Sequence, residues 1–162
     1  IIEYVTMSST GNASDFGDLT VNKRNHAGAS NSTRGLSIGG ASTDVIDYIT
    51  IASTGNATDF GDCQSAINEE IGGEQGGTSN TMDYVTIAST GNATDFGDLA
   101  SSNNAGAAGT SGSGRGVFAG ISSSRGSIEY ITISTTGNSS DFGDLSIARK
   151  TLGACSAAHA GL

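Results

Sequence analysis

The chain has 162 residues, with 25 glycines, no proline and no tryptophan, and its formal net charge is −9. Its seven lysines and arginines are too few for the basic stripe that nucleic-acid binding requires, so we expect no nucleic-acid partner. Apolar residues recur at fixed positions, which excludes a disordered chain, and no apolar run is long enough to predict a membrane span.

One ten-residue motif occurs four times and organises the chain. It reads Ser-Thr-Gly-Asn-Ala-Thr-Asp-Phe-Gly-Asp at Ser53–Asp62 and Ser89–Asp98, and close variants occupy Ser9–Asp18 and Thr135–Asp144. A run of the type apolar-acid-Tyr-apolar-Thr precedes each copy and begins at Ile2, Ile46, Met82 and Ile128. A period of roughly 40 residues is typical of propellers, solenoids and arrays. We therefore expect a single repeat domain, 1–162, with repeats of approximately 2–45, 46–81, 82–127 and 128–162.

Most of the negative charge belongs to this repeated unit, because each copy carries two aspartates in the motif and one acid in the preceding run. Beyond this, the negative net charge bears only on solubility.

Each motif and its preceding run predict a β-hairpin. Alternation of residue types over 46–51 is typical of a strand, and the following Ser-Thr-Gly-Asn predicts a turn, because glycine and asparagine tolerate positive φ angles. Thr-Asp-Phe-Gly-Asp then forms the return strand. The recurring tyrosines and phenylalanines are expected to be structural core residues: Tyr4, Phe16, Tyr48, Phe60, Tyr84, Phe96, Tyr130 and Phe142.

The segments between hairpins predict further short strands. A small-residue strand over 27–30 suits close packing against other backbones, and apolar strands that end in glycine follow at 34–40 and 115–120. A full repeat then holds about four strands. The return segment of the second repeat, 64–81, is shorter, so we expect one strand there to be shortened or lost. No segment predicts a helix.

The two cysteines, Cys63 and Cys155, occupy non-equivalent positions in their repeats. Cys63 stands where Leu19, Leu99 and Leu145 stand elsewhere, which favours two buried free thiols over a disulfide or a metal pair.

The aspartate pairs are weak candidates for Ca²⁺ ligands, because the ion prefers carboxylate oxygens. Their spacing is not that of an EF-hand loop, so we favour a structural role in which they accept backbone N–H groups, and we expect no metal and no cofactor. The candidates are Asp15, Asp18, Asp59, Asp62, Asp95, Asp98, Asp141 and Asp144. The Asn-Ala-Thr/Ser triplets also match glycan acceptors, but a turn explains them. No nucleophile–base–orienter set is present, so we do not expect an enzyme.

The order Gly-Gly, apolar-acid-Tyr, turn, aromatic, Leu and small-residue strand resembles a kelch repeat. Gly39-Gly40 supplies the glycine pair, and Phe60 and Phe96 stand where that family usually has tryptophan. The long motif is more closely similar to Gly-rich repeats of phage virion and tail-associated proteins. The resemblance covers the whole chain and implies an all-β, kelch-like β-propeller of four blades. The chain opens on Ile1 within the pattern, so the four units either close with a terminal strand or form part of a larger ring.

This resemblance implies a structural protein of a virion that binds other virion proteins or a host-surface glycan, with a homo-oligomer also open. The alternatives are a carbohydrate- or Ca²⁺-binding module of a secreted bacterial protein and, more remotely, a propeller enzyme. Binding residues are expected in the loops that do not repeat. The loop candidates are Lys23, Arg24, Arg34, Glu69, Glu70, Arg115 and Arg125.

Overall fold

The computed structural model describes residues 1–40, 43–67, 80–100, 108–112, 114–120, 126–149 and 152–153, although not the side chains of 66 and 67. Within these residues the chain contains strands and turns and no helix, which confirms the all-β prediction. It follows that this part of the chain contains no helix able to cross a membrane.

Twelve strands in the described part of the chain form four antiparallel sheets. The first sheet pairs β1 (Ile2–Tyr4) with β2 (Ser14–Gly17). The second has the order β3 (Ala27–Ser30), β4 (Arg34–Gly40), β5 (Thr43–Thr50) and β6 (Thr58–Ile67). The third pairs β7 (Thr81–Tyr84) with β8 (Thr94–Asp98). The fourth contains β9 (Ala108–Gly112), β10 (Arg115–Ala119), β11 (Ser127–Thr132) and β12 (Ser140–Asp144), each hydrogen-bonded to the next.

The four motif hairpins share one register. In β5–β6, Ile46 lies opposite Gly61 and Asp47 lies opposite Asp59, so the register shifts by one residue between them. The same shift occurs in β1–β2, β7–β8 and β11–β12. A repeated bulge of this kind bends the return strand and increases its twist.

The reversal in each hairpin lies earlier than the sequence predicted. The turn occupies Thr50–Ser53, where the Ser53 amide donates to the Thr50 carbonyl oxygen over 3.2 Å. Gly55 follows the turn with a φ of 157°, which is far from the φ of a left-handed turn glycine. Gly55 therefore does not form the tight turn of the hairpin.

The core lies between successive sheets. Leu36, Ile46, Phe60 and Cys63 form one buried cluster, and side chains of the next repeat, among them Val85, pack against it. A second cluster of Met82, Phe96 and Leu99 is covered by Phe118 and Ile131 of the fourth sheet.

The small-residue strands are less enclosed than expected. In β3 and β9 only the first residue, Ala27 or Ala108, is buried.

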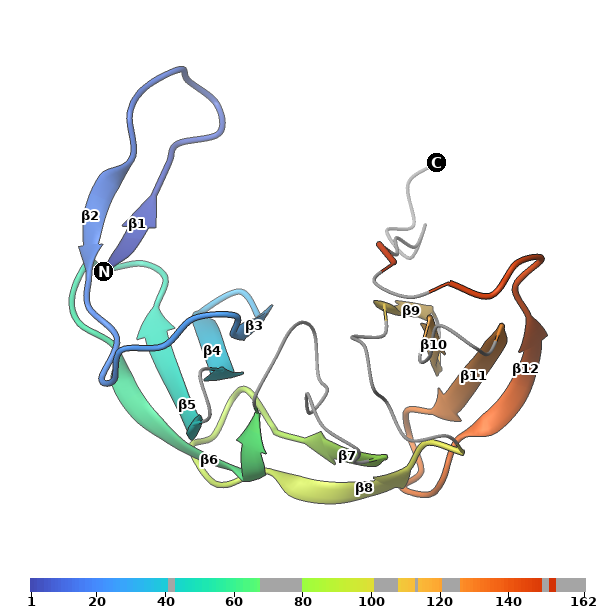
Figure 1. The fold of residues 1–162 in the computed structure, drawn as a ribbon. Helices are drawn as coiled ribbons and strands as arrows, with labels where there is room; N and C mark the ends of the chain where they lie inside the picture. Colours follow the sequence, from blue (N-terminus) through green and yellow to red (C-terminus); the bar gives the residue numbers. More distant parts are fainter. Residues whose placement is uncertain are drawn as a thin grey trace.

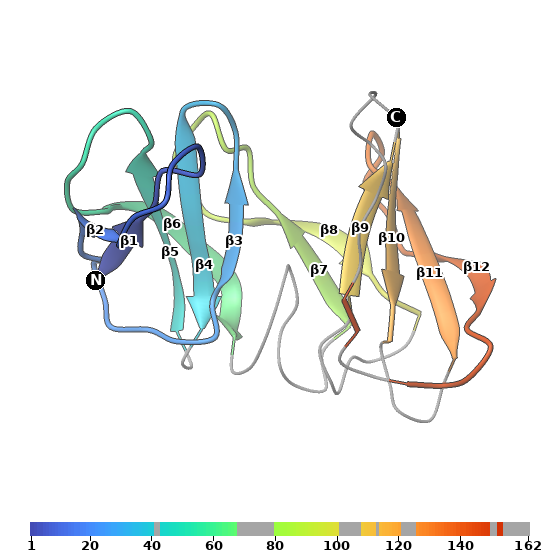
Figure 2. The same cartoon turned by 90° about the horizontal axis from the view of Figure 1, so that it is seen from above.

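The sheets follow one another along an arc (Figure 1), with the β1–β2 hairpin at one end and β12 at the other. Seen from above (Figure 2), the two four-stranded sheets stand on either side of β7–β8. The described strands form no closed ring.

Candidate functional site: the junctions between repeats

The repeated motif joins each hairpin to the repeat before it. The Gly55 amide donates to the Phe16 carbonyl oxygen over 2.7 Å, and the Ala57 amide donates to the Asp18 carbonyl oxygen over 2.8 Å. We call the Gly-Asn-Ala/Ser stretch the docking segment and the Asp-Phe-Gly-Asp strand of the preceding repeat the receiving strand. The same two bonds recur from Gly91 to Phe60 and Ala93 to Asp62, and from Gly137 to Phe96 and Ser139 to Asp98.

The asparagine of the docking segment completes this ladder. The Asp18 amide donates to Asn56 Oδ1 over 3.0 Å. The equivalent bonds join Asp62 to Asn92 over 3.1 Å and Asp98 to Asn138 over 3.0 Å. The contact runs like a parallel ladder, in which the amide oxygen of the asparagine stands where a main-chain carbonyl would stand.

A glycine in each receiving strand allows the two backbones to approach. A Cβ atom built on Gly17 would lie 2.3 Å from the Gly55 carbonyl oxygen, and one on Gly61 would lie 2.5 Å from the Gly91 carbonyl. The same is true of Gly97 against Gly137. No side chain fits there, so this glycine is a requirement of the junction.

The acid of the apolar-acid-Tyr run forms a second link across each junction. The Gln64 amide donates to Asp83 Oδ2 over 3.1 Å, and the Ala100 amide donates to Glu129 Oε2 over 2.9 Å. In the first junction, Thr20 Oγ1 donates to Asp47 Oδ1. Three acids that recur in sequence are thus each bonded to the residue two positions after the Asp-Phe-Gly-Asp of the preceding repeat.

Lys23 is buried, although the sequence placed it among the exposed loop candidates. Its side chain is 0% exposed, and its Nζ atom lies 3.0 Å from Asp47 Oδ2, whose side chain is also 0% exposed. The Nζ atom also donates to the Ser37 and Val45 carbonyl oxygens over 3.1 and 3.0 Å. All these partners are internal, because a charge removed from water must be paired and hydrogen-bonded. The prediction for Lys23 is therefore corrected to a structural role.

Two other loop candidates lie over aromatic rings. The guanidinium carbons of Arg34 and Arg115 lie 4.6 and 4.3 Å from the ring centroids of Tyr48 and Tyr130. Arg34 Nη1 also donates to the Ile87 carbonyl oxygen, which lies between β7 and β8, over 3.2 Å. Arg24 is exposed. The remaining candidates, Glu69, Glu70 and Arg125, lie outside the described residues.

The motif tyrosines and phenylalanines pair edge to face within each hairpin, with centroids 5.9 to 6.1 Å apart. The phenylalanines of the first three receiving strands are buried, whereas Phe142 is 54% exposed. Tyr4 and Tyr84 are 45% and 43% exposed, so these rings cover the phenylalanines from outside. The expected core role thus belongs to the first three phenylalanines more than to the tyrosines.

The candidate Ca²⁺ ligands do not gather into a binding site in the described part of the chain, where no group of three acidic, histidine or cysteine side chains converges. Asp95 and Asp141 each accept the amide of the glycine two residues later over 3.2 Å. The second aspartate of each motif contributes its main chain to the junction in the first three repeats.

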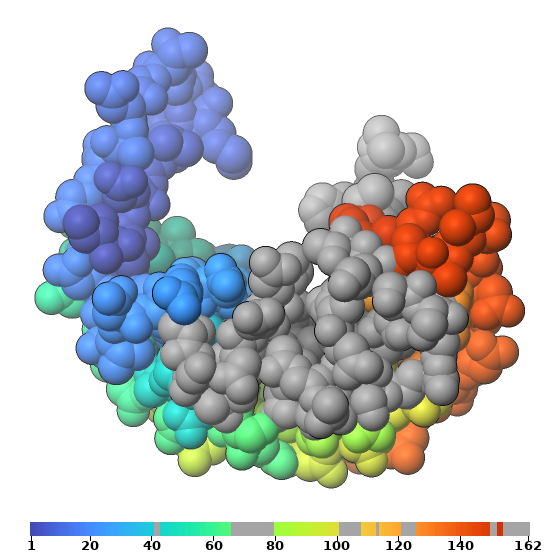
Figure 3. All heavy atoms as spheres, in the orientation of Figure 1, coloured from blue at the N-terminus to red at the C-terminus, as the bar shows by residue number. Residues whose placement is uncertain are grey.

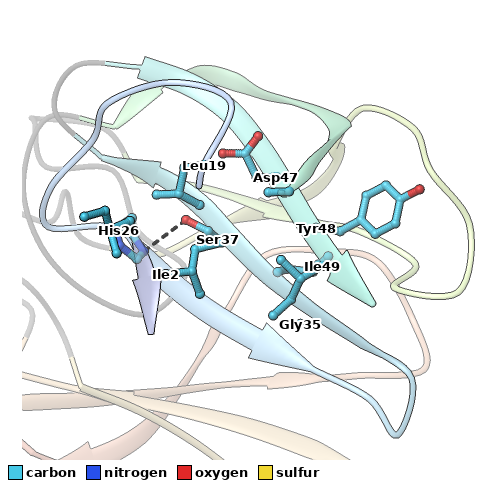
Figure 4. Close-up of a pocket in the computed structure, with 11 residues that line it drawn as sticks. Ile2, Leu19, His26, Gly35, Ser37, Asp47, Tyr48 and Ile49 are labelled. Atoms are coloured by element: carbon cyan, nitrogen blue, oxygen red, sulfur yellow. Dashed lines mark hydrogen bonds between the residues drawn. The ribbon is translucent and has the colours of Figure 1, made fainter. Parts of the chain in front are cut away.

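A cavity of about 260 Å³ lies in the first junction (Figure 4). Ile2 and Leu19 line it from one side and Ser37, Tyr48 and Ile49 from the other. Ser37 Oγ lies 3.1 Å from His26 Nδ1 at its edge.

The junction between the β7–β8 hairpin and the fourth sheet shows why this cavity exists. The equivalents of Ile2, Leu19 and Ile49 are Met82, Leu99 and Ile131, and there Phe118 packs into the cluster at the position that Ser37 holds in β4. The cavity therefore follows from a serine in place of an aromatic residue.

Two groups titrate unusually. Burial, with the charges of Asp83 and Asp44 adding to it, raises the pKa of the Cys63 thiol to about 11, so the thiol is neutral near pH 7 and unsuited to nucleophilic attack. Burial also raises the pKa of Asp83, against the opposing effect of the Gln64 amide. Its Oδ1 atom has no hydrogen-bond partner among the described residues. Cys155 lies outside the described residues.

Neither the protein-family models nor the curated proteins contain a match to this chain. The site is therefore defined by geometry alone. The sequence predicted that the repeated Gly-Asn lies in a turn and that Asp-Phe-Gly-Asp forms a return strand, but it did not predict that the two meet across repeats. The asparagines bond to receiving strands 38, 30 and 40 residues earlier, so no constant sequence spacing marks the contact.

Proposed function

We propose that the chain is a non-catalytic, kelch-like β-propeller module of a virus particle, tail-associated or exposed on the particle surface. In this proposal it binds a neighbouring particle protein or a host-surface glycan through the segments that do not repeat. The virion context rests on the resemblance of the long motif to repeats of that kind.

The junctions carry the proposal. The repeated asparagines, the docking-segment glycines and the acids of the apolar-acid-Tyr runs bond to the neighbouring repeat, so these recurring polar groups have structural partners. Propellers are built from four-stranded antiparallel sheets repeated around an axis, and the second and fourth sheets are four-stranded meanders that lie along an arc (Figure 1).

The segments that remain for recognition lie on a rigid frame. The β3–β4 connection is fixed by Asn31, whose Oδ1 accepts the amides of Thr33 and Arg34 over 2.9 and 2.8 Å. The connection before it presents Arg24 and His26 at the surface. Exposed polar loops on a fixed scaffold are where binding residues concentrate.

Glycan-array binding by the purified chain, together with its presence in purified particles, tests the proposal. We expect binding to fall when residues 24–26 are replaced by Gly-Ser-Gly and to persist when the exposed Ser8 and Thr10 of the repeated turn are replaced by alanine. Binding to neither glycan nor particle protein would contradict the recognition role. Turnover of a bound glycan would contradict the non-catalytic role.

A further inference from the structure

Among the described residues, one docking segment and one receiving strand have no partner repeat. The docking segment of the first repeat is Gly11-Asn12-Ala13, and the receiving strand of the last repeat is β12. A Cβ atom built on Gly143 of β12 would meet no atom within 4 Å. The three receiving glycines before it would each clash with a docked backbone. In the part of the chain that the structure describes, both halves of a junction are therefore present, and no main-chain hydrogen bond joins either half to a neighbouring repeat.

The apolar side chains of these two halves are exposed. Phe142 of β12 is 54% exposed, whereas Phe16, Phe60 and Phe96, each covered by a docked repeat, are 9%, 2% and 8% exposed. On the other half, Val5 and Met7 are 58% and 96% exposed. Their equivalents in the third repeat, Val85 and Ile87, pack against the cluster around Phe60. In the internal junction at Phe60, the receiving strand is covered by the valine and isoleucine side chains and by the docking segment of the next repeat.

The polar groups of the two halves match as well. Asn12 corresponds to Asn56, Asn92 and Asn138, whose side-chain oxygens accept the main-chain amides of Asp18, Asp62 and Asp98. Asp144 of β12 is the equivalent of these aspartates. Glu3 is exposed and corresponds to the acids that accept an amide just beyond the receiving strand, here that of Ser146. Arg115 is exposed and corresponds to Arg34, which donates to the Ile87 carbonyl across a junction, so Arg115 matches the carbonyl of Met7.

We propose that β12 of one molecule receives the first docking segment of a second copy of this chain, head to tail. The contact repeats the three internal junctions, with the Asp144 amide donating to Asn12 Oδ1 and the exposed Phe142 covered by Val5 and Met7 of the partner.

Self-closure does not supply the partner in this structure, because the first hairpin and β12 lie on opposite arms of the open arc (Figure 3). A heterologous contact of this kind builds rings when its rotation closes and filaments when it does not. An edge strand with free N–H and C=O groups and an exposed aromatic ring is the usual template for such pairing.

Two blocking variants and their mixture test the proposal by sedimentation velocity and light scattering over a concentration series. Met7→Glu places a charge on the docking side at a residue that is 96% exposed, so it leaves the fold unchanged. Asp144→Pro removes the outward amide of the edge strand β12, a position where proline is tolerated. We expect the wild type to gain mass with concentration and each variant alone to stay monomeric. An equal mixture forms complexes of two chains, because each variant keeps one intact half.

Asn12→Ala and Asn92→Ala serve as a matched pair. We expect Asn12→Ala to weaken association about tenfold, the effect of one lost hydrogen bond of ordinary strength. Asn92→Ala lies in an internal junction and should associate like the wild type. If thermal melting shows that Asp144→Pro fails to fold, Phe142→Ser replaces it as the variant of β12.

A wild type that stays monomeric at every concentration would overturn the proposal, and so would a monomer whose first docking segment lies on its own β12. Association that survives both blocking variants would also overturn it, as would a mixture that contains only single chains.

Discussion

The side-chain oxygen of Asn56 accepts a hydrogen bond from the main-chain amide of Asp18 over 3.0 Å, across a separation of 38 residues. With the bonds from Gly55 and Ala57, it fixes the second repeat to the first. The same set recurs at the next two junctions, so the most repeated residues of the chain hold neighbouring repeats together.

Replacement of Lys23 by methionine should destabilise the protein strongly, because it leaves the fully buried carboxylate of Asp47 without its ion pair. We expect a loss of about 3–5 kcal/mol in the free energy of unfolding, measured by urea denaturation. Arg24→Met, at the exposed neighbouring residue, is the control and should change stability by less than about 0.5 kcal/mol. Equal effects of the two substitutions would show that Lys23 has no internal role.

The double variant Lys23→Met/Asp47→Leu should recover part of that loss. A buried ion pair replaced by apolar side chains of similar size is often close to neutral, whereas a single unpaired charge is not. The two substitutions are therefore expected to be far from additive in urea denaturation.

Gly61→Ala should cost more stability than Gly143→Ala. Both glycines have positive φ angles, 145° and 141°, so both substitutions strain the backbone. Only at Gly61 would the new Cβ atom also meet a docked backbone, 2.5 Å from the Gly91 carbonyl. The difference between the two variants, about 1–3 kcal/mol by denaturation at low protein concentration, measures the close approach itself. Equal losses would mean that the junction tolerates a side chain.

Ser37→Phe should stabilise the first junction. The phenyl ring would enter the cavity beside Ile2 and Leu19, as Phe118 does in the later junction. A gain of about 0.5–2 kcal/mol is typical of cavity filling, and it should appear as a raised melting temperature. Ser37→Ala, which removes the contact with His26 without filling the cavity, is the control. A lower melting temperature for Ser37→Phe than for Ser37→Ala would contradict this account of the cavity.

Asp83→Asn should change how stability depends on pH. The pKa of Asp83 is raised by burial, so the folded protein holds this proton more tightly than the unfolded chain does. The resulting stabilisation is present below the unfolded pKa of about 3.8 and is lost as the pH rises through the higher folded pKa. Asparagine keeps an oxygen for the Gln64 amide but does not titrate, so the variant should lack this loss in denaturation curves across the acid range. An unchanged pH profile would exclude Asp83 as its source.

The sequence predicted the hairpins and the all-β class because both follow from local pattern: the alternation at 46–51 and the apolar-acid-Tyr run became β5 and its counterparts. It did not predict which repeat each motif bonds to. Gly-Asn has a strong turn preference by itself, whereas in the structure Gly55 and Asn56 are held by hydrogen bonds to Phe16 and Asp18 of the preceding repeat. Local sequence propensity contains no information about a partner that is distant in the chain.

The burial of the Lys23 charge could not be predicted from the local sequence for the same reason. A lysine in a segment rich in polar residues predicts exposure, and the buried acid that pairs with it belongs to the next repeat. The cavity beside Ser37 could have been found from sequence alone by aligning 34–40 with 115–120, which sets Ser37 against Phe118.

The repeated asparagine joins one repeat to the one before it. Equilibrium denaturation of Asn92→Ala and Asn12→Ala, at a concentration where the wild type is monomeric, tests this role. The two residues hold the same place in the motif, but among the described residues only Asn92 of the two has a receiving strand. We predict that Asn92→Ala lowers the free energy of unfolding by about 1–2 kcal/mol, the cost of an amide left without its partner, and that Asn12→Ala leaves it unchanged. Equal effects of the two substitutions would contradict the claim, because the asparagine would then act within its own hairpin.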